Sequence, residues 1–340
     1  MSIPIIAFFN NKGGVGKTSL VYHLAWMYRE LGLRVIAADL DPQANLTAAF
    51  LAEERLEEVW LLNNQPNTIY RCVQPLVRGV GDIATPQLED VAPGLSLLVG
   101  DLFLSGFEGN LSTEWPGCMD RKELSFRMTS AFWRLLQRAM AIYSPNVVLL
   151  DLGPNLGAIN RAAMIASDYV VVPLSPDLFS LQGLHNLGPT LRRWRSEWHE
   201  RVKKNPSTDL KLPTAKMQPV GYVVLQHLQH SSRPDKPAKA YQRWIDRIPN
   251  TYRRTILDAT ETDVDISEDV YCLSLVKHYK SLMPLAQTAH KPIFQLTSAD
   301  GAVGGSIQAA QNAYQDFEQL ARKIARNCKA YKKNAAVITE

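Results

Sequence analysis

The sequence predicts an α/β protein with a mainly parallel, doubly wound sheet of about seven strands between helices, in three layers. Three observations support this fold class: short apolar runs alternate with helical patterns, a glycine-rich turn follows the first run, and aspartates end two later runs. Ligands bind beyond the carboxyl ends of strands in such sheets, so these motifs would share one edge. The 340 residues contain no internal repeat, and we expect a single domain across 1–340.

Composition narrows the class of protein further. Hydrophobic residues make up 46% and charged residues 21%, as in a water-soluble globular protein. No run reaches the ~18 apolar residues that a membrane span needs, and the start has no basic segment typical of a signal peptide. The four cysteines, Cys72, Cys118, Cys272 and Cys328, lack C-x-x-C spacing, which favours free thiols in a reducing cytoplasm.

The first element is an apolar strand near Ile3–Phe9 that runs into a glycine-rich turn and a helix from Thr18 to about Leu31. Gly13, Gly14 and Gly16 allow the backbone N–H groups to approach phosphate oxygens, while Lys17 adds a positive charge. The following helix directs its positive end at the same anion, and the Thr18 hydroxyl is a candidate Mg²⁺ ligand. The predicted phosphate-binding residues are Asn11, Lys12, Gly13, Gly14, Val15, Gly16, Lys17, Thr18 and Ser19.

The turn departs from the common P-loop pattern, because Asn11 stands where glycine is usual. With Lys12 next to it, the string Lys12–Thr18 resembles the deviant P-loop of the ParA/MinD family of ATPases. The resemblance implies that Lys12 reaches the nucleotide of a partner subunit, so that a homodimer closes over two molecules of ATP with Mg²⁺. Lys12 and Lys17 would then stabilise the charge that develops during hydrolysis.

A second strand, from Arg34 to Asp39, leads into Asp39–Thr47, which resembles the family motif D-x-D-P-Q-x-N. The resemblance implies that Asp41 orients the attacking water, and that Asp39 supports the metal and its waters. Asp39 alone could instead cap a helix that begins before Leu46.

The third motif is Asn146–Pro154, an apolar strand that ends on Asp151. We expect Asp151 to hold the Mg²⁺ water shell. The family usually has proline where this chain has Gly153, which suggests a more mobile second switch. The loop would sense the γ-phosphate by becoming ordered.

The rest of the chain is less closely similar to the family. We expect strands at Leu95–Val99, after Asp168, at Pro219–Leu225 and at Val270–Val276, an irregular loop over 111–120, and helices at Arg121–Tyr143 and Ile307–Lys333. By resemblance the adenine would lie near Gln226, Met283 and Pro284. His290 replaces the glycine of the family's G-K-P-I string, and whether it or Gly153 affects hydrolysis is left open.

The net charge of +4 conceals a basic segment, residues 191–254, with 15 Lys/Arg and five Asp/Glu. Basic residues interleaved with Trp194, Trp198, Tyr241, Trp244 and Tyr252 are typical of a surface that binds duplex DNA without reading its sequence. A solvated helix face with aromatic residues in the core would give the same pattern. The candidate DNA-binding residues are Arg192, Arg193, Arg195, Lys203, Lys204, Lys239, Arg243 and Arg247.

Residues 111–143, 196–218 and 229–269 are expected to be insertions in the family frame. The last helix carries basic residues, as a MinD-like membrane anchor would, but alanines supply little apolar surface near its end, which favours a docked helix without stable membrane insertion.

The resemblance therefore implies a cytoplasmic ATPase with slow intrinsic turnover that joins the nucleoid when ATP is bound. It would partition plasmid or chromosomal DNA or position a cargo, with hydrolysis stimulated by an adaptor of ParB type. The alternative is an ATP-dependent switch that assembles protein partners, in defence, secretion or positioning, without contacting DNA.

Overall fold

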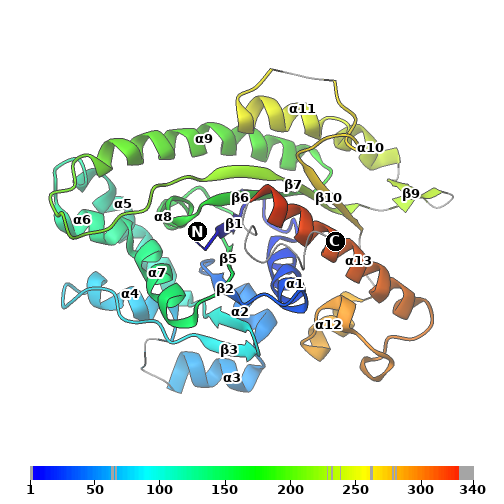
Figure 1. The fold of residues 1–340 in the computed structure, drawn as a ribbon, viewed down its shortest axis with the longest axis horizontal. Helices are drawn as coiled ribbons and strands as arrows, with labels where there is room; N and C mark the ends of the chain where they lie inside the picture. The colour runs from blue at the N-terminus through cyan, green and yellow to red at the C-terminus, as the bar shows by residue number, and fades with distance from the viewer. Residues whose placement is uncertain are drawn as a thin grey trace. The chain divides into compact units, whose positions relative to one another are not determined.

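The computed structural model describes residues 3–62, 65, 67–227, 229–230, 233–237, 239–260, 263–277, 279 and 282–328. Within these ranges, eight strands form one sheet in the order β10-β7-β6-β1-β5-β2-β4-β3 (Figure 1). The strands are β1 (Ile5–Phe8), β2 (Val35–Asp39), β3 (Glu89–Ala92), β4 (Leu95–Leu98), β5 (Val147–Asp151), β6 (Tyr169–Leu174), β7 (Gln218–His227) and β10 (Cys272–Lys277). A separate antiparallel pair joins β8 (Gln229–His230) to β9 (Arg233–Pro237).

The predicted α/β fold is confirmed, with one strand more than expected. β2 pairs in parallel with both β4 and β5, and β10 pairs in parallel with β7. The additional strand is β3, which pairs antiparallel with β4 at the edge of the sheet. Its sequence, Glu-Asp-Val-Ala, lacks the apolar run of a buried strand, because an edge strand is only partly covered.

The chain divides into two compact units, and each is described by itself. The first comprises Met1–Ala7, Gly32–Val170 and Leu191–Gln218. It contains the buried strands β2 and β5, in which every side chain lies in the core. Its helices are α2 (Asn45–Phe50), α3 (Glu53–Glu57), α4 (Ile69–Val77), α5 (Phe107–Gly117), α6 (Glu123–Thr129), α7 (Ala131–Tyr143), α8 (Ala158–Ala166) and the second part of α9 (Leu178–Val202), with a π-helix at Glu58–Leu62 and a 3-10 helix at Leu102–Gly106.

The prediction of an irregular loop over 111–120 is wrong, because residues up to Gly117 belong to helix α5. Phe107, Leu111 and Trp115 recur every four residues and are all buried, so tertiary packing overrides the glycines and the proline of this segment. Trp115 stacks on Trp198 of α9, with ring centroids 6.0 Å apart. The guanidinium carbons of Arg161 and Arg201 lie 4.2 and 4.1 Å from the Trp115 ring centroid.

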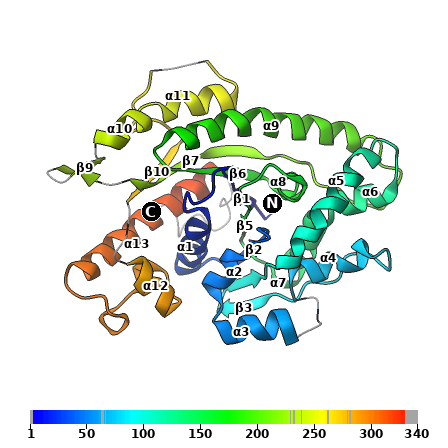
Figure 2. The same cartoon turned by 180° about the vertical axis from the view of Figure 1, so that it is seen from behind.

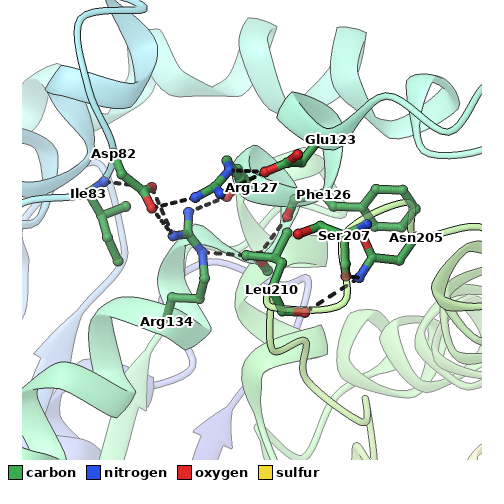
Figure 3. A network of polar contacts seen from close by, with 10 residues as sticks. Asp82, Ile83, Glu123, Phe126, Arg127, Arg134, Asn205, Ser207 and Leu210 are labelled. Carbon is green, nitrogen blue, oxygen red and sulfur yellow. Dashed lines mark hydrogen bonds and ion pairs between the residues drawn. The ribbon is translucent and has the colours of Figure 1, made fainter.

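The single helix predicted over Arg121–Tyr143 is also wrong, because the segment forms α6 and α7 with a break at Ser130. Figure 3 shows the side chains at this break. Arg134 donates to the Arg127 carbonyl oxygen at 2.8 Å, and both guanidinium groups bind Asp82. Partial burial raises the pKa of Asp82, but the hydrogen bonds from Arg134 and Ile83 and the two positive charges outweigh it and hold the pKa below its usual value.

The second unit comprises Phe8–Leu31, Val171–Thr190 and Pro219–Glu340. Helix α1 packs against the last described helix, and the Tyr28 hydroxyl donates to the Ala321 carbonyl oxygen at 3.1 Å. The helices are α1 (Lys17–Glu30), the first part of α9, α10 (Lys239–Ile245), α11 (Ile248–Tyr252), α12 (Met283–Ala289) and α13 (Gly305–Asn327), with a π-helix at Arg253–Leu257 and 3-10 helices at Ile293–Gln295 and Ser298–Asp300. Figure 2 shows these elements from behind.

Two further predictions concern the last helix and membrane association. The predicted end of the last helix, Lys333, lies outside the described residues, whereas Arg322, Lys323 and Arg326 belong to α13. In the described part of the chain, no helix combines the length and apolarity needed to cross a membrane.

Candidate functional site

The glycine-rich turn begins with Asn10, two residues after the end of β1. Its side-chain amide donates to the Pro173 carbonyl oxygen at 2.7 Å, and its side-chain oxygen accepts from the Lys12 backbone N–H at 3.0 Å. Asn10 is only 1% exposed, so these bonds fix the direction in which the chain leaves the strand.

The turn has the backbone geometry of a phosphate-binding loop. Gly14 and Gly16 have φ angles of 71° and 87°, in the left-handed region that favours glycine. Gly16 caps α1, a helix of 14 residues whose first turn has no acidic side chain to neutralise its positive end. Lys17 is buried in this first turn, and Thr18 and Ser19 are half-buried beside it. An anion at this helix start would meet backbone N–H groups and a lysine.

Lys12 makes an ion pair with Asp177, the residue immediately before α9. The other carboxylate oxygen of Asp177 accepts from the Ser180 backbone N–H at 2.9 Å, which caps the start of α9. Gly183, one turn further, packs on the loop, since a Cβ there would lie 2.6 Å from the Asn11 side-chain oxygen. Asn11 itself does not have a positive φ, so this position does not require glycine.

A cavity of about 110 Å³ adjoins the start of α1. It is mostly apolar and includes Met283, one of the three predicted adenine contacts, whereas Pro284 is not part of the lining. The third, Gln226, lies in β7, and its side chain is outside the described residues. The lining residues are Gly16, Ser19, Leu20, His23, Leu225, Val276, Lys277, Tyr279, Met283, Ile293 and Phe317. Pockets for whole drug-sized ligands usually reach ~300 Å³ or more, so this cavity suits one ring system.

Asp39 and Asp151 end the neighbouring strands β2 and β5, where they are paired in register. Both are completely buried. One oxygen of Asp39 accepts from both the backbone N–H and the hydroxyl of Thr47 at 2.8 Å, and Thr47 in turn accepts from the Gly100 N–H. Asp39 therefore does cap the first turn of α2, one of the alternatives that its sequence position left open.

Asp41 lies two residues beyond the end of β2 and is 5% exposed. One of its oxygens accepts from the Gln43 backbone N–H at 3.0 Å. Gly153 lies against this carboxylate, because a Cβ at position 153 would be 3.1 Å from the same oxygen. The glycine that departs from the family pattern thus leaves room for Asp41.

Asp39, Asp41 and Asp151 influence one another electrostatically, although the described residues contain no group of three or more acidic, histidine or cysteine side chains placed to hold a metal ion. Burial raises the pKa of Asp39 to about 8, and the negative charges of Asp151 and Asp41 add to the effect, against the hydrogen bonds from Thr47. Buried carboxylates close together are stable when they share a proton or a bound cation. Carboxylate oxygens are hard ligands of the kind that Mg²⁺ prefers, either directly or through its waters.

The loop after Asp151 is held by two side chains that the sequence analysis did not single out. Asn160 donates to the carbonyl oxygens of Gly153 and Asn155, at 2.9 and 2.6 Å. Glu108 accepts from the first two backbone N–H groups of α8, those of Ala158 and Ile159, at 2.5 and 2.8 Å. A glutamate from another helix thus caps α8, which no local pattern could indicate.

The candidate DNA-binding residues differ in exposure. Arg193, Lys203 and Lys204 are exposed, whereas Arg192 and Arg195 are half-buried. Arg195 donates to the Met217 carbonyl oxygen at 2.7 Å, and burial together with the Arg192 charge lowers its pKa. Arg195 therefore makes a structural hydrogen bond in addition to carrying a positive charge.

The aromatic residues of the basic segment are mostly core. Trp194, Trp198 and Tyr252 are buried, which corrects the expectation that they interleave with the surface charges. The exposed Arg243 of α10 and the exposed Arg247, which immediately precedes α11, flank the half-buried Trp244, with guanidinium carbons 4.6 and 5.5 Å from its ring centroid. The Lys239 side chain lies outside the described residues.

Comparison with known proteins identifies the family of this chain. A protein-family model described as "AAA domain" matches residues 3–204. The chromosome partitioning protein ParA of Caulobacter vibrioides is 31% identical over 201 residues, which cover 59% of this chain and 67% of that protein.

Two solved structures share the fold. Protein DIP2308 from Corynebacterium diphtheriae matches with a TM-score of 0.71 at 23% identity, over 95% of this chain and 98% of that one. A putative plasmid partition protein from Borrelia burgdorferi, bound to AMPPNP, matches with a TM-score of 0.54 at 17% identity, over 96% and 99% of the two chains.

The glycine loop at the start of α1 and the aspartates that end β2 and β5 define the class as a P-loop nucleoside triphosphatase fold. The family model spans more than half of the chain, and the ParA relative is matched over two thirds of its length. The chain therefore belongs to this AAA-domain family and, within it, to the ParA-type ATPases.

Proposed function

We propose that this protein is an ATPase that dimerises around Mg²⁺ and ATP, binds duplex DNA without sequence preference in that state, and partitions DNA or positions a cargo. The observation that carries the proposal is the loop from Asn10 to Thr18, in which two left-handed glycines and a buried lysine open a helix, with Lys12 beside them. Membership of the ParA-type family supports it.

The residues of the chain have distinct proposed roles. The backbone N–H groups of Gly13–Thr18 and the Lys17 ammonium bind the phosphates of ATP, and Lys12 stabilises charge on the nucleotide of a second subunit. Asp41 orients the attacking water, held by its bond from Gln43 N–H and its contact with Gly153. Thr18, Asp39 and Asp151 would hold Mg²⁺ and its waters, and the ion would neutralise charge on the phosphate oxygens.

The cavity at the start of α1 is the proposed place of the adenine ring, with Met283 in its lining. Apolar walls with few polar groups suit a flat base, which binds mainly through dispersion and exclusion of water.

The DNA-binding surface is proposed to use the exposed charges Arg193, Lys203 and Lys204, and the cluster of Arg243, Trp244 and Arg247 at the end of α10 and the start of α11. Lysine and arginine side chains that neutralise phosphates release counterions, which favours binding to any sequence. The localisation that follows is cytoplasmic, with association to the nucleoid when ATP is bound. Hydrolysis, slow in the protein alone, is stimulated by an adaptor of ParB type.

The test is binding to a random-sequence duplex at ~100 mM salt, with Mg²⁺ and ATP, with Mg²⁺ and ADP, and without nucleotide. The double variant Arg193→Glu, Lys203→Glu is compared with a matched control, Arg78→Glu, Lys122→Glu, which reverses two exposed charges outside the basic segment. We expect DNA binding only with ATP, and we expect this binding to be lost in the first variant and kept in the control. The slope of the logarithm of the binding constant against the logarithm of the salt concentration should decrease in magnitude by about one for each lost phosphate contact.

Binding that ignores the nucleotide would refute the proposed switch. If the protein hydrolyses ATP and dimerises but does not bind DNA even at low salt, the protein-assembly alternative takes its place.

A further inference from the structure

The ion pair between Lys12 and Asp177 lies within one subunit, although the proposed function assigns Lys12 to the nucleotide of a second subunit. One lysine ammonium on a single side chain cannot occupy both places. An Asp177 carboxylate that binds Lys12 therefore competes with dimerisation.

Asp177, which forms the ion pair with Lys12, is itself fixed by further contacts. Asp177 uses one oxygen to cap α9 through Ser180 N–H at 2.9 Å, while the Ser180 hydroxyl accepts from the Ser175 N–H at 3.0 Å. Gly183 then packs against Asn11 and Asn10 of the loop, where a Cβ would lie 2.6 and 2.8 Å from their side-chain oxygens. The first turn of α9 is thus fixed against the loop that carries Lys12.

The ion pair is accessible, and its neighbours are apolar. The side chains of Lys12 and Asp177 are 28% and 32% exposed, so a second molecule can reach them. Directly after Asp177 come Leu178 and Phe179, which are 51% and 71% exposed. Two large apolar side chains beside a half-exposed ion pair are typical of a surface that becomes buried on association.

We propose that Asp177 is a positioning residue that retains Lys12 in its own subunit, and that a second copy of this chain releases Lys12 and covers Leu178 and Phe179. This inference rests on the proposed function, because it assumes that the partner is a second ATP-bound copy. The ion pair sets how much protein is needed before the dimer forms.

The test is the variant Asp177→Asn, which removes the charge but keeps a side-chain oxygen for the Ser180 cap. Asp300→Asn is the matched control, since Asp300 also pairs with a lysine, Lys291, at 2.7 Å, and also accepts a backbone N–H at a helix start. Dimerisation is measured by sedimentation velocity over a range of protein concentrations, with Mg²⁺ and AMPPNP.

Two ion pairs must open for each dimer, and pairs of this exposure change an equilibrium by roughly 1.4- to 5-fold each. We therefore expect the dimer dissociation constant of Asp177→Asn to fall by roughly 2- to 30-fold, and that of Asp300→Asn to stay within error of the wild type. Phe179→Ser should raise the dimer dissociation constant without changing nucleotide binding by the monomer.

A second readout uses the monomer without nucleotide. The rate at which Lys12 reacts with an acetylating reagent, followed by mass spectrometry, should rise in Asp177→Asn and not in Asp300→Asn. An unchanged rate, or a wild-type dimer that Asp177→Asn fails to strengthen, would overturn the inference and leave the proposed function standing. If neither the wild type nor Asp177→Asn dimerises, both this inference and the proposed function are rejected.

Discussion

Protonation of His23 is the perturbation for which the structure gives the most definite magnitude. His23 lies in α1, one turn after Ser19, and is 2% exposed. Its Nε2 accepts from the Ile293 backbone N–H at 3.2 Å, and its Nδ1 is 2.6 Å from the Ser19 carbonyl oxygen. The ring stacks on Phe317 at 4.9 Å. Because Nε2 must accept, the ring is neutral with its proton on Nδ1, and a second proton would break the bond to Ile293.

Burial lowers the pKa of His23 to about 4, although the bond to the Ser19 carbonyl opposes this shift. In the unfolded chain the pKa is about 6.5. Between these values the unfolded state binds more protons than the folded state, so stability falls as the pH falls. From pH 8 to pH 5 the loss is about 2 kcal/mol, from about 1.4 kcal/mol for each unit of pH below 6.5.

The assay is urea unfolding at pH 8 and pH 5 for the wild type and for His23→Gln. Other groups titrate in both proteins, so the difference between the two pH dependences isolates His23. We expect the wild type to lose about 2 kcal/mol more than the variant. His199→Gln is the matched control, because it makes the same exchange of residue types at an exposed position. Equal losses in the wild type and His23→Gln would refute the argument.

Three further substitutions test contacts that the structure defines. Gly188→Ala would place a Cβ 1.8 Å from the Thr255 carbonyl oxygen, so we expect a loss of about 3 kcal/mol in urea unfolding; a loss below about 1 kcal/mol would contradict this packing. Glu108→Ala removes the cap of α8 and should cost about 1–2 kcal/mol by the same assay, whereas Glu108→Gln, which can still accept, should cost less. Gly183→Val would push against the Asn11 side chain, and we expect nucleotide binding, measured by calorimetry, to weaken about tenfold without loss of fold; unchanged affinity would show that the loop adapts.

The parts of the fold that local sequence predicts are those where one pattern decides the structure. The strands β2 and β5 are unbroken apolar runs that end on aspartates, so both the strand and the place of its carboxylate follow from the pattern. The glycine turn was equally clear, since Gly14 and Gly16 adopt the left-handed φ that makes glycine necessary.

Helix α5 shows why other parts could not be predicted as well. Its segment contains Gly109, Pro116 and Gly117, which favour a turn, and these signals outweighed the spacing of Phe107, Leu111 and Trp115. That spacing was the available evidence for a helix, and the reason the helix wins is tertiary: Trp115 packs between α8 and α9. The contacts of Asp177 and Glu108 also depend on tertiary structure, because their partners lie 165 and about 50 residues away in the sequence.

Asn11 departs from the common P-loop pattern, and Gly153 and His290 depart from the pattern of the family; the contacts of each residue explain how the exchange is tolerated. Asn11 replaces a glycine at a position without positive φ, so the exchange costs no backbone strain there. Gly153 replaces a proline, and its missing Cβ leaves space at the Asp41 carboxylate, where a proline ring would crowd the oxygen.

His290 is different, because its φ of 48° ends α12 in the conformation that glycine adopts most easily. A non-glycine residue there costs about 1 kcal/mol or more in the folded state, partly offset by the greater freedom that glycine has when unfolded. The three exchanges therefore fall into two kinds. Those at positions 11 and 153 adjoin the proposed phosphate and water-orienting groups and are sterically compatible with them, whereas the strained one ends helix α12. The physical expectation is that Asn11 and Gly153 preserve the chemistry of the family, and that His290 lowers stability through its left-handed backbone.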